Sequence, residues 1–141
     1  MNISAKRARH LGGWLVLALM VGGAWPVAVL SIPKSEQVAQ QVYSRWPDFP
    51  REGSDRPDSS LVRRLALYHT KVCGRPTTSR LDWKLTLADY LGVNLAMSPE
   101  TYPEANGRPD LLNADRRAID RFTRAERNRL VETLVQVYLR L

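Results

Sequence analysis

The sequence predicts an all-α protein, in which a single N-terminal transmembrane helix precedes a small domain of about four helices joined by long proline-rich loops. Three observations predict this fold class. Residues 11–32 contain no charged side chain, apolar residues recur at helical spacing in four later segments, and prolines gather between those segments. We therefore divide the chain into a basic segment (1–10), a membrane segment (11–32) and a domain (33–141).

The uncharged stretch is long enough to be a transmembrane helix. Its 22 residues would extend about 33 Å as a helix, and a bilayer has a hydrocarbon core of about 30 Å. Trp14 and Trp25 lie near its two ends, where indole rings prefer the headgroup boundary. A cleaved secretory signal is the alternative, because small residues near Gly22 resemble a cleavage site and Pro26 would kink the helix or end it early.

Charge beside this stretch predicts its orientation. Lys6, Arg7 and Arg9 precede it, whereas Lys34 and Glu36 cancel after it. The positive-inside rule then places the N-terminus in the cytoplasm and the domain on the trans side, which is periplasmic, lumenal or extracellular. An anchor and a signal would both export the domain. Three of the seven net positive charges lie in the basic segment, and the four that remain on the domain suit an anionic lipid or an acidic protein partner.

The first helix of the domain is predicted over residues 35–43 and ends before Trp46 and Pro47. Residues 46–58 then form an extended connector, because prolines and a glycine recur among alternating charges. Trp46 and Phe49 are unusual in a solvated connector. Either they fold back onto the core of the domain, or they are anchors for a partner.

Three further helical segments follow. One begins at Asp58 or Ser59 and ends at Gly74, with two apolar stripes that leave Arg63, Arg64 and Lys71 outside. A second runs between Ser79 and Gly92; part of it alternates like a strand, but no other segment offers a strand partner. A long irregular loop covers 93–109. The strongest helical pattern covers 113–141, with a break at Thr123, whose spacing to Glu126 makes a capping box.

Cys73 is the only cysteine, so no intrachain disulfide can form. His69 lies one helical turn earlier, and the two side chains are possible ligands of zinc or copper. Zinc sites use three or four protein ligands, however, and the other histidine, His10, lies across the membrane in this topology. We expect a buried thiol beside a core histidine. The sequence predicts no metal site, no cofactor and no catalytic residue, so we do not expect an enzyme.

Six arginines fall within residues 116–129. Arg117, Arg121 and Arg124 would share one face of a continuous helix, because they follow the i, i+4, i+7 spacing. One interpretation is a solvated face that pairs with neighbouring acids such as Asp120. The other is a docking strip for anionic headgroups or an acidic partner, because arginine makes bidentate contacts to carboxylate and phosphate.

The segment from Thr86 to Val93 contains an Ala-x-x-x-Gly-Val pattern that resembles the first helix and turn of bacterial helix-turn-helix regulators. Pro99-Glu100-Thr101 is similar to the start of their second helix. The resemblance implies DNA binding. It departs from the family where Pro99 and Pro103 interrupt the stretch that would form the recognition helix, and a domain across the membrane would not meet DNA. Nucleic acid is therefore not the expected partner.

Together these features favour a single-pass, membrane-anchored accessory, assembly or scaffold protein of a membrane complex. We expect it to bind a protein partner or an anionic lipid surface through Arg117, Arg121 and Arg124, and then through Trp46 and Phe49. A membrane-tethered DNA-binding regulator is the first alternative. A secreted small helical binding protein is the second, and it applies if residues 11–32 are cleaved.

Overall fold

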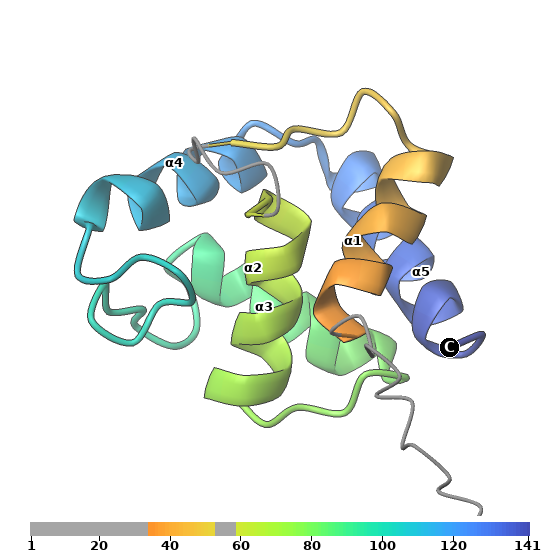
Figure 1. Cartoon of the computed structure of the whole chain (residues 1–141), viewed down its shortest axis with the longest axis horizontal. Helices are drawn as coiled ribbons and strands as arrows, with labels where there is room; N and C mark the ends of the chain where they lie inside the picture. Colours follow the sequence, from red (N-terminus) through yellow and green to blue (C-terminus); the bar gives the residue numbers. More distant parts are fainter. Residues whose placement is uncertain (1–33, 53–58) are drawn as a thin grey trace, which may run out of the picture. The chain divides into compact units, whose positions relative to one another are not determined.

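Five α-helices make up the part of the chain that the computed structural model describes, residues 34–52 and 59–141 (Figure 1). No strand occurs in this part, which confirms the all-α prediction for it. The predicted transmembrane segment lies outside the described residues, and no helix within them is long and apolar enough to cross a bilayer. The helices are α1 (Lys34–Arg45), α2 (Leu61–Leu67), α3 (Arg80–Tyr90), α4 (Pro109–Asp120) and α5 (Arg124–Tyr138).

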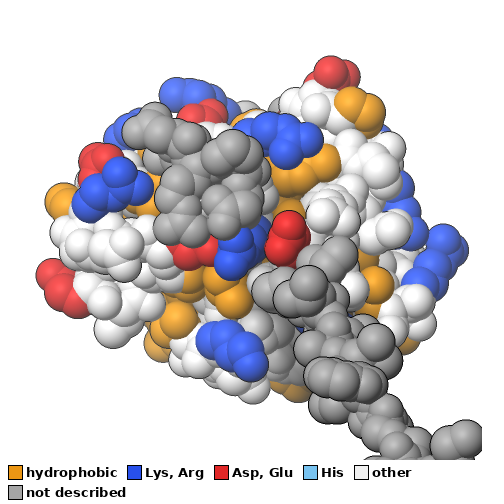
Figure 2. Space-filling model, in the orientation of Figure 1, with side chains coloured by type: hydrophobic (Ala, Val, Ile, Leu, Met, Phe, Trp, Pro, Cys, Tyr) orange, Lys and Arg blue, Asp and Glu red, His pale blue; other side chains and the backbone are white. Residues whose placement is uncertain are grey.

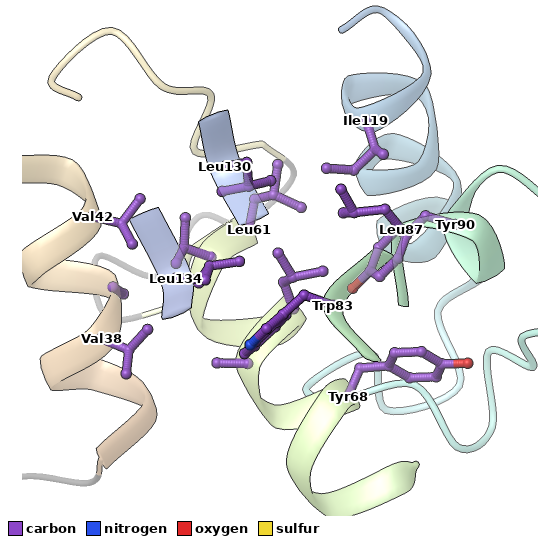
Figure 3. Close-up of a cluster of buried hydrophobic side chains, with 14 of the residues drawn as sticks. Val38, Val42, Leu61, Tyr68, Trp83, Leu87, Tyr90, Ile119, Leu130 and Leu134 are labelled. Carbon is purple, nitrogen blue, oxygen red and sulfur yellow. The ribbon is translucent and has the colours of Figure 1, made fainter. Parts of the chain in front are cut away.

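One hydrophobic core joins all five helices. Helix α1 packs on α2 and α5, and α3 packs on α4 and α5. Side chains from each helix point toward one another in the close-up of Figure 3, and none of those labelled is more than 4% exposed. Burial of this kind is the main stabilising contribution to a domain without disulfides. The labelled side chains are Val38, Val42, Leu61, Tyr68, Trp83, Leu87, Tyr90, Ile119, Leu130 and Leu134.

Local signals place most helix ends where the sequence predicts them. Ser79 caps α3 by accepting from the Asp82 amide, and Thr123 forms the predicted capping box with Glu126 at the start of α5. Gly74 ends the second helical segment with φ +61°, a left-handed conformation that suits glycine. Helix α4 begins earlier than residue 113, because Pro109 occupies its first turn, where no amide hydrogen is needed.

The second helical segment is not a regular α-helix throughout. Helix α2 continues directly into η1 (Tyr68–Val72), a π-helical turn in which the Cys73 amide donates to the Tyr68 carbonyl at 2.9 Å. A π turn contains more residues than an α turn, so side chains after it are rotated from their α-helical directions. Val72, predicted on an apolar stripe, is accordingly 43% exposed.

The aromatic residues of the connector fold back onto the domain. The ring centroids of Trp46 and Phe49 are 5.0 Å apart, and the ring of Phe49 lies 5.2 Å from that of Phe122, in the turn between α4 and α5. Phe49 is 2% exposed, so it offers no surface to a partner, whereas Trp46 is partly buried. Phe49 therefore packs in the core, and Trp46 packs against it while keeping part of its ring exposed. Residues 53–58 of the predicted connector lie outside the described part.

Candidate functional site

The three predicted arginines lie on both sides of a break between helices. Arg117 belongs to α4, Arg121 is the residue that ends α4, and Arg124 is the first residue of α5. The i, i+4, i+7 face therefore does not continue across them, because the chain leaves the helix at residues 121–123. All three side chains are exposed.

Arg117 and Arg124 each line a hollow, and the two hollows share Leu91. The first hollow, of about 270 Å³, lies where α3 ends beside α4. The second, of about 130 Å³, is a groove between α3 and α5. We call their combined lining the Leu91 surface. Its basic residues are Lys84, Arg116, Arg117, Arg124 and Arg127, and its apolar ones are Leu87, Ala88, Leu91 and Val131, beside Tyr90, Asp120 and Asn128.

Arg121 has a different environment. It is not among the residues that line either hollow, and its Nη1 lies 3.8 Å from Oε1 of Glu52. Its side chain is 69% exposed, so this ion pair is screened by solvent. The structure thus brings two of the three predicted arginines to one surface and places the third beside an acidic residue.

The end of α3 positions the Leu91 surface. The amides of Gly92 and Val93 donate to the carbonyls of Asp89 and Ala88, which is the Schellman pattern, and Gly92 has φ +73°. Arg116 Nε donates to the Tyr90 carbonyl at 3.0 Å, close to the negative end of the α3 dipole. A Cβ on Gly92 would lie 2.8 Å from Arg116 Nη2, so any other residue here would make this guanidinium shift from its present position.

Of the five basic residues of the Leu91 surface, two are held by hydrogen bonds to backbone carbonyls and two others are available to a ligand. Arg116 binds the Tyr90 carbonyl, and Arg127 Nη1 donates to the Phe122 carbonyl. Within residues 34–52 and 59–141, no acidic side chain pairs with Arg117 or Arg124. These two guanidiniums therefore keep their donors free for a ligand carboxylate or phosphate.

Of this surface, sequence reasoning identified only Arg117 and Arg124 as contact residues, and among those it missed are Lys84, Leu91 and Arg127. A signal for the first two was present, because Lys84, Ala88 and Leu91 follow the i, i+4, i+7 spacing on α3. No local pattern connects them with Arg124 and Arg127, since the pairing of α3 with α5 is a tertiary contact. Their meeting could be found only from the fold.

A second polar cluster lies inside the domain, and it corrects the prediction for Arg64. Expected outside the apolar stripes, Arg64 is completely buried and pairs with the equally buried Asp115 of α4. Its Nε and Nη2 lie 2.6 and 2.7 Å from the two carboxylate oxygens, and Nη2 also donates to the Glu52 carbonyl. Charge is tolerated here because the bidentate pair satisfies both groups.

Two tyrosines complete this buried cluster. Tyr102 donates to Asp115 at 2.5 Å, and Tyr90 lies 2.9 Å from the Tyr102 hydroxyl. Burial raises the pKa of both phenols well above the usual value, and the nearby Asp115 charge acts in the same direction. Burial also raises the pKa of Asp115, although hydrogen bonds from Arg64 and its charge oppose this shift. Since Arg64 and Asp115 have no exposed side-chain surface, the cluster holds the long loop rather than meeting a solute.

Asp89 makes a third polar cluster, at the start of the same loop. Its carboxylate accepts from Arg75 Nη1 at 2.6 Å, from the Tyr68 hydroxyl at 3.2 Å, and from Asn94 Nδ2 and the Leu95 amide at 2.6 and 2.9 Å. These donors come from η1, from the turn after it and from the loop after α3. The irregular loop predicted over 93–109 is thus held by two buried carboxylates: Asp89 binds its start, and Asp115 binds Tyr102 near its middle.

His69 and Cys73 do not form an exposed pair. His69 is completely buried, stacks on Trp83 with centroids 3.6 Å apart, and bonds through its two ring nitrogens to Thr86 Oγ1 and the Pro76 carbonyl. Burial lowers its pKa, so the neutral ring is favoured. Cys73 is a half-buried free thiol. Among the described residues, no group of three or more His, Cys, Asp or Glu side chains is arranged to hold a metal.

The helix-turn-helix resemblance holds for its first helix only. Helix α3 ends at Tyr90 and turns at Gly92, as the pattern predicts, but residues 99–107 contain turns and no helix. The next helix begins at Pro109, so no second helix follows the turn closely as in that motif. On the face shown in Figure 2, basic side chains are spread among hydrophobic and neutral ones rather than gathered into one block.

The chain was compared with protein-family models, with curated proteins and with solved structures, and none of the three comparisons finds a match.

Proposed function

We propose that this chain is a single-pass, membrane-anchored accessory or scaffold protein whose helical domain binds an acidic amphipathic helix of a protein partner at the Leu91 surface. One observation carries the proposal. Arg117 and Arg124 are exposed, have no acidic partner within the described residues, and flank hollows that share the apolar Leu91. Membrane anchoring rests on the sequence of residues 11–32.

The size of the groove favours a side chain over a cofactor as its occupant. Small-molecule sites usually enclose about 300–1,000 Å³. The groove between α3 and α5 has about 130 Å³, which suits one or two aliphatic side chains. A helix laid along α3 and α5 would place such an anchor over Ala88 and Leu91, as amphipathic helices do in apolar grooves.

The positive charge of the Leu91 surface favours an acidic partner helix. The groove's lining includes Lys84, Arg124 and Arg127 and no acidic residue, and the adjacent hollow adds Arg116 and Arg117 against the single acid Asp120. A partner helix with Asp or Glu one turn from its apolar anchor would complement these cations. Such complementarity raises the association rate and excludes basic partners, and it weakens as salt rises.

The test uses the full chain in its membrane with a photo-reactive amino acid in place of Ala88. After irradiation and gentle solubilisation, mass spectrometry identifies the cross-linked segment. We expect an acidic, apolar helical segment whose cross-link disappears in the Arg117→Ala/Arg124→Ala variant. Arg121→Ala is the matched control and should retain the cross-link, because that guanidinium faces Glu52.

Three results would overturn the proposal. The first is equal cross-linking in the paired variant and the control. The second is a cross-linked segment that is basic or not helical. The third is that duplex DNA or anionic vesicles, rather than a protein, bind the Leu91 surface in an Arg117- and Arg124-dependent way.

A further inference from the structure

Three helix ends lie along one edge of the domain. The start of α1, the end of η1 and the end of α5 lie along the lower edge of Figure 1. A side-chain contact joins the start of α1 to the end of α5, since Lys34 Nζ lies 5.5 Å from the centroid of the Tyr138 ring. A hollow of about 360 Å³ at this edge is lined by Lys34, Ser35, Leu67, Thr70, Lys71, Thr77 and Tyr138.

This edge is both basic and apolar. The described residues that line its hollow include two lysines and no acid. Close to Lys71 and Tyr138 in the sequence, three apolar side chains are exposed to solvent: Val72 is 43% exposed, Leu139 60% and Leu141 50%. We name Lys34, Lys71, Val72, Tyr138, Leu139 and Leu141 the Lys34 face. A surface with lysines among leucines and a tyrosine is typical of contacts with the bilayer interface.

Along the sequence, Lys34 follows the predicted membrane segment almost directly. Only Pro33 separates Lys34 from Ile32, the last residue of the uncharged stretch. Two Cα–Cα steps span at most about 7 Å, which is within the Debye length of about 8 Å at physiological salt. Wherever residue 32 meets the headgroups, Lys34 must therefore remain within reach of their phosphates.

We infer that the Lys34 face rests on the anionic headgroup surface of the bilayer. Lys34 and Lys71 bind lipid phosphates, while Leu139, Leu141 and Val72 enter the interface. The inference rests on the membrane anchor of the proposed function, but it concerns a different surface from the Leu91 surface. The two lie at opposite ends of α5, because Arg124 and Tyr138 are its first and last residues, about 21 Å apart along the helix axis.

The test places an environment-sensitive fluorophore on single cysteines in the full chain, in a Cys73→Ser background. Leu139→Cys reports on the Lys34 face, and Ala125→Cys, exposed near the other end of α5, is the matched control. The chains are reconstituted into phosphatidylcholine vesicles with and without phosphatidylglycerol, with spin-labelled lipid as quencher. We expect a blue shift and quenching at 139, strongest with phosphatidylglycerol, and neither at 125.

Charge is tested by Lys34→Gln/Lys71→Gln, with circular dichroism as the folding control. This variant should lose most of the quenching at 139 in phosphatidylglycerol vesicles while the chain remains membrane-bound. Equal signals at 139 and 125 would overturn the inference, as would a blue shift at 139 without lipid quenching, which indicates contact with another protein copy. Extraction of the chain by alkaline carbonate would overturn the anchor instead, and quenching at 139 would still decide whether this face binds lipid.

Discussion

Arg64 shows how a single residue can depart from the pattern of its segment. It lies between apolar positions on α2, where a helical reading places a charged side chain outside, yet no part of its side chain is exposed. Its partner Asp115 is 51 residues away in the sequence. No local rule connects the two, because the pair exists only once α2 and α4 are brought together.

Removing one member of this pair should destabilise the domain more than removing both. Arg64→Met leaves a buried carboxylate without its cation, and Asp115→Leu leaves a buried guanidinium without its anion. Loss of one partner of a buried ion pair costs about 3–5 kcal/mol. The double variant Arg64→Met/Asp115→Leu should recover part of this loss, because neither charge then remains.

The measurement is urea unfolding of the four chains in a double-mutant cycle, followed by circular dichroism. A matched control is Arg80→Met/Glu132→Leu, since that ion pair is largely exposed and should contribute less than about 1 kcal/mol. Additive losses at Arg64 and Asp115 would show that the pair does not interact as its geometry indicates.

His69 should make stability depend on pH just below neutrality. Burial lowers its pKa in the folded state, whereas an unfolded histidine titrates near 6.5. The unfolded state therefore binds the proton first as the pH falls, so stability is full above about pH 6.5 and is lost below it, by at most about 1.4 kcal/mol per pH unit. Urea midpoints between pH 7.5 and 5.5 measure this loss. In His69→Gln, which does not titrate, the dependence over this range should disappear; an unchanged slope would assign it to other groups.

At the scale of elements, two helix-ending glycines with similar positive φ angles should differ in how much stability the domain loses when alanine replaces them. Gly74 has φ +61° and Gly92 φ +73°, so alanine at either position occupies the left-handed region at a cost of about 1–2 kcal/mol. A Cβ at position 74 meets nothing within 4 Å, but at position 92 it meets Arg116 Nη2 at 2.8 Å. Gly92→Ala should therefore destabilise more than Gly74→Ala, since it also displaces Arg116 from the end of α3.

Urea unfolding of the two variants gives the comparison. In addition, Gly92→Ala should weaken any ligand of the Leu91 surface, whereas Gly74→Ala should not. Equal stability losses and equal binding would mean that Arg116 moves away without consequence.

Most helix boundaries could be predicted, and the reasons are local. Ser79, Thr123 with Glu126, Gly74 and Gly92 act within their own turns, so their side-chain chemistry is visible in the sequence. The π turn of η1 was not predictable in this way. Apolar periodicity assumes one helical repeat, whereas Tyr68 and His69 of η1 contact Asp89, Thr86 and Trp83, which come from α3.

At the scale of the whole molecule, the candidate site was half predictable. The cluster of arginines marked the right region, but the break at residues 121–123 interrupts their common helix face, and most of the apolar part of the site comes from α3. If the Lys34 face lies on the bilayer, α5 carries Arg124 away from it. The Leu91 surface would then be presented to the extramembrane part of a partner.

The orientation that we propose from the N-terminal charges puts the domain on the trans side, and it predicts the behaviour of reporter fusions. Alkaline phosphatase fused after Leu141 should be active, because it folds only outside the cytoplasm, and a cytoplasm-only fluorescent reporter at the same place should remain dark. Replacing Lys6, Arg7 and Arg9 by Gln should lower phosphatase activity, since the proposed orientation rests on these charges. Lys34→Gln is the matched control: it removes the basic residue on the other flank and should preserve the orientation. A fluorescent fusion with inactive phosphatase would instead place the domain in the cytoplasm, where the alternative of a DNA-binding regulator would gain its first support.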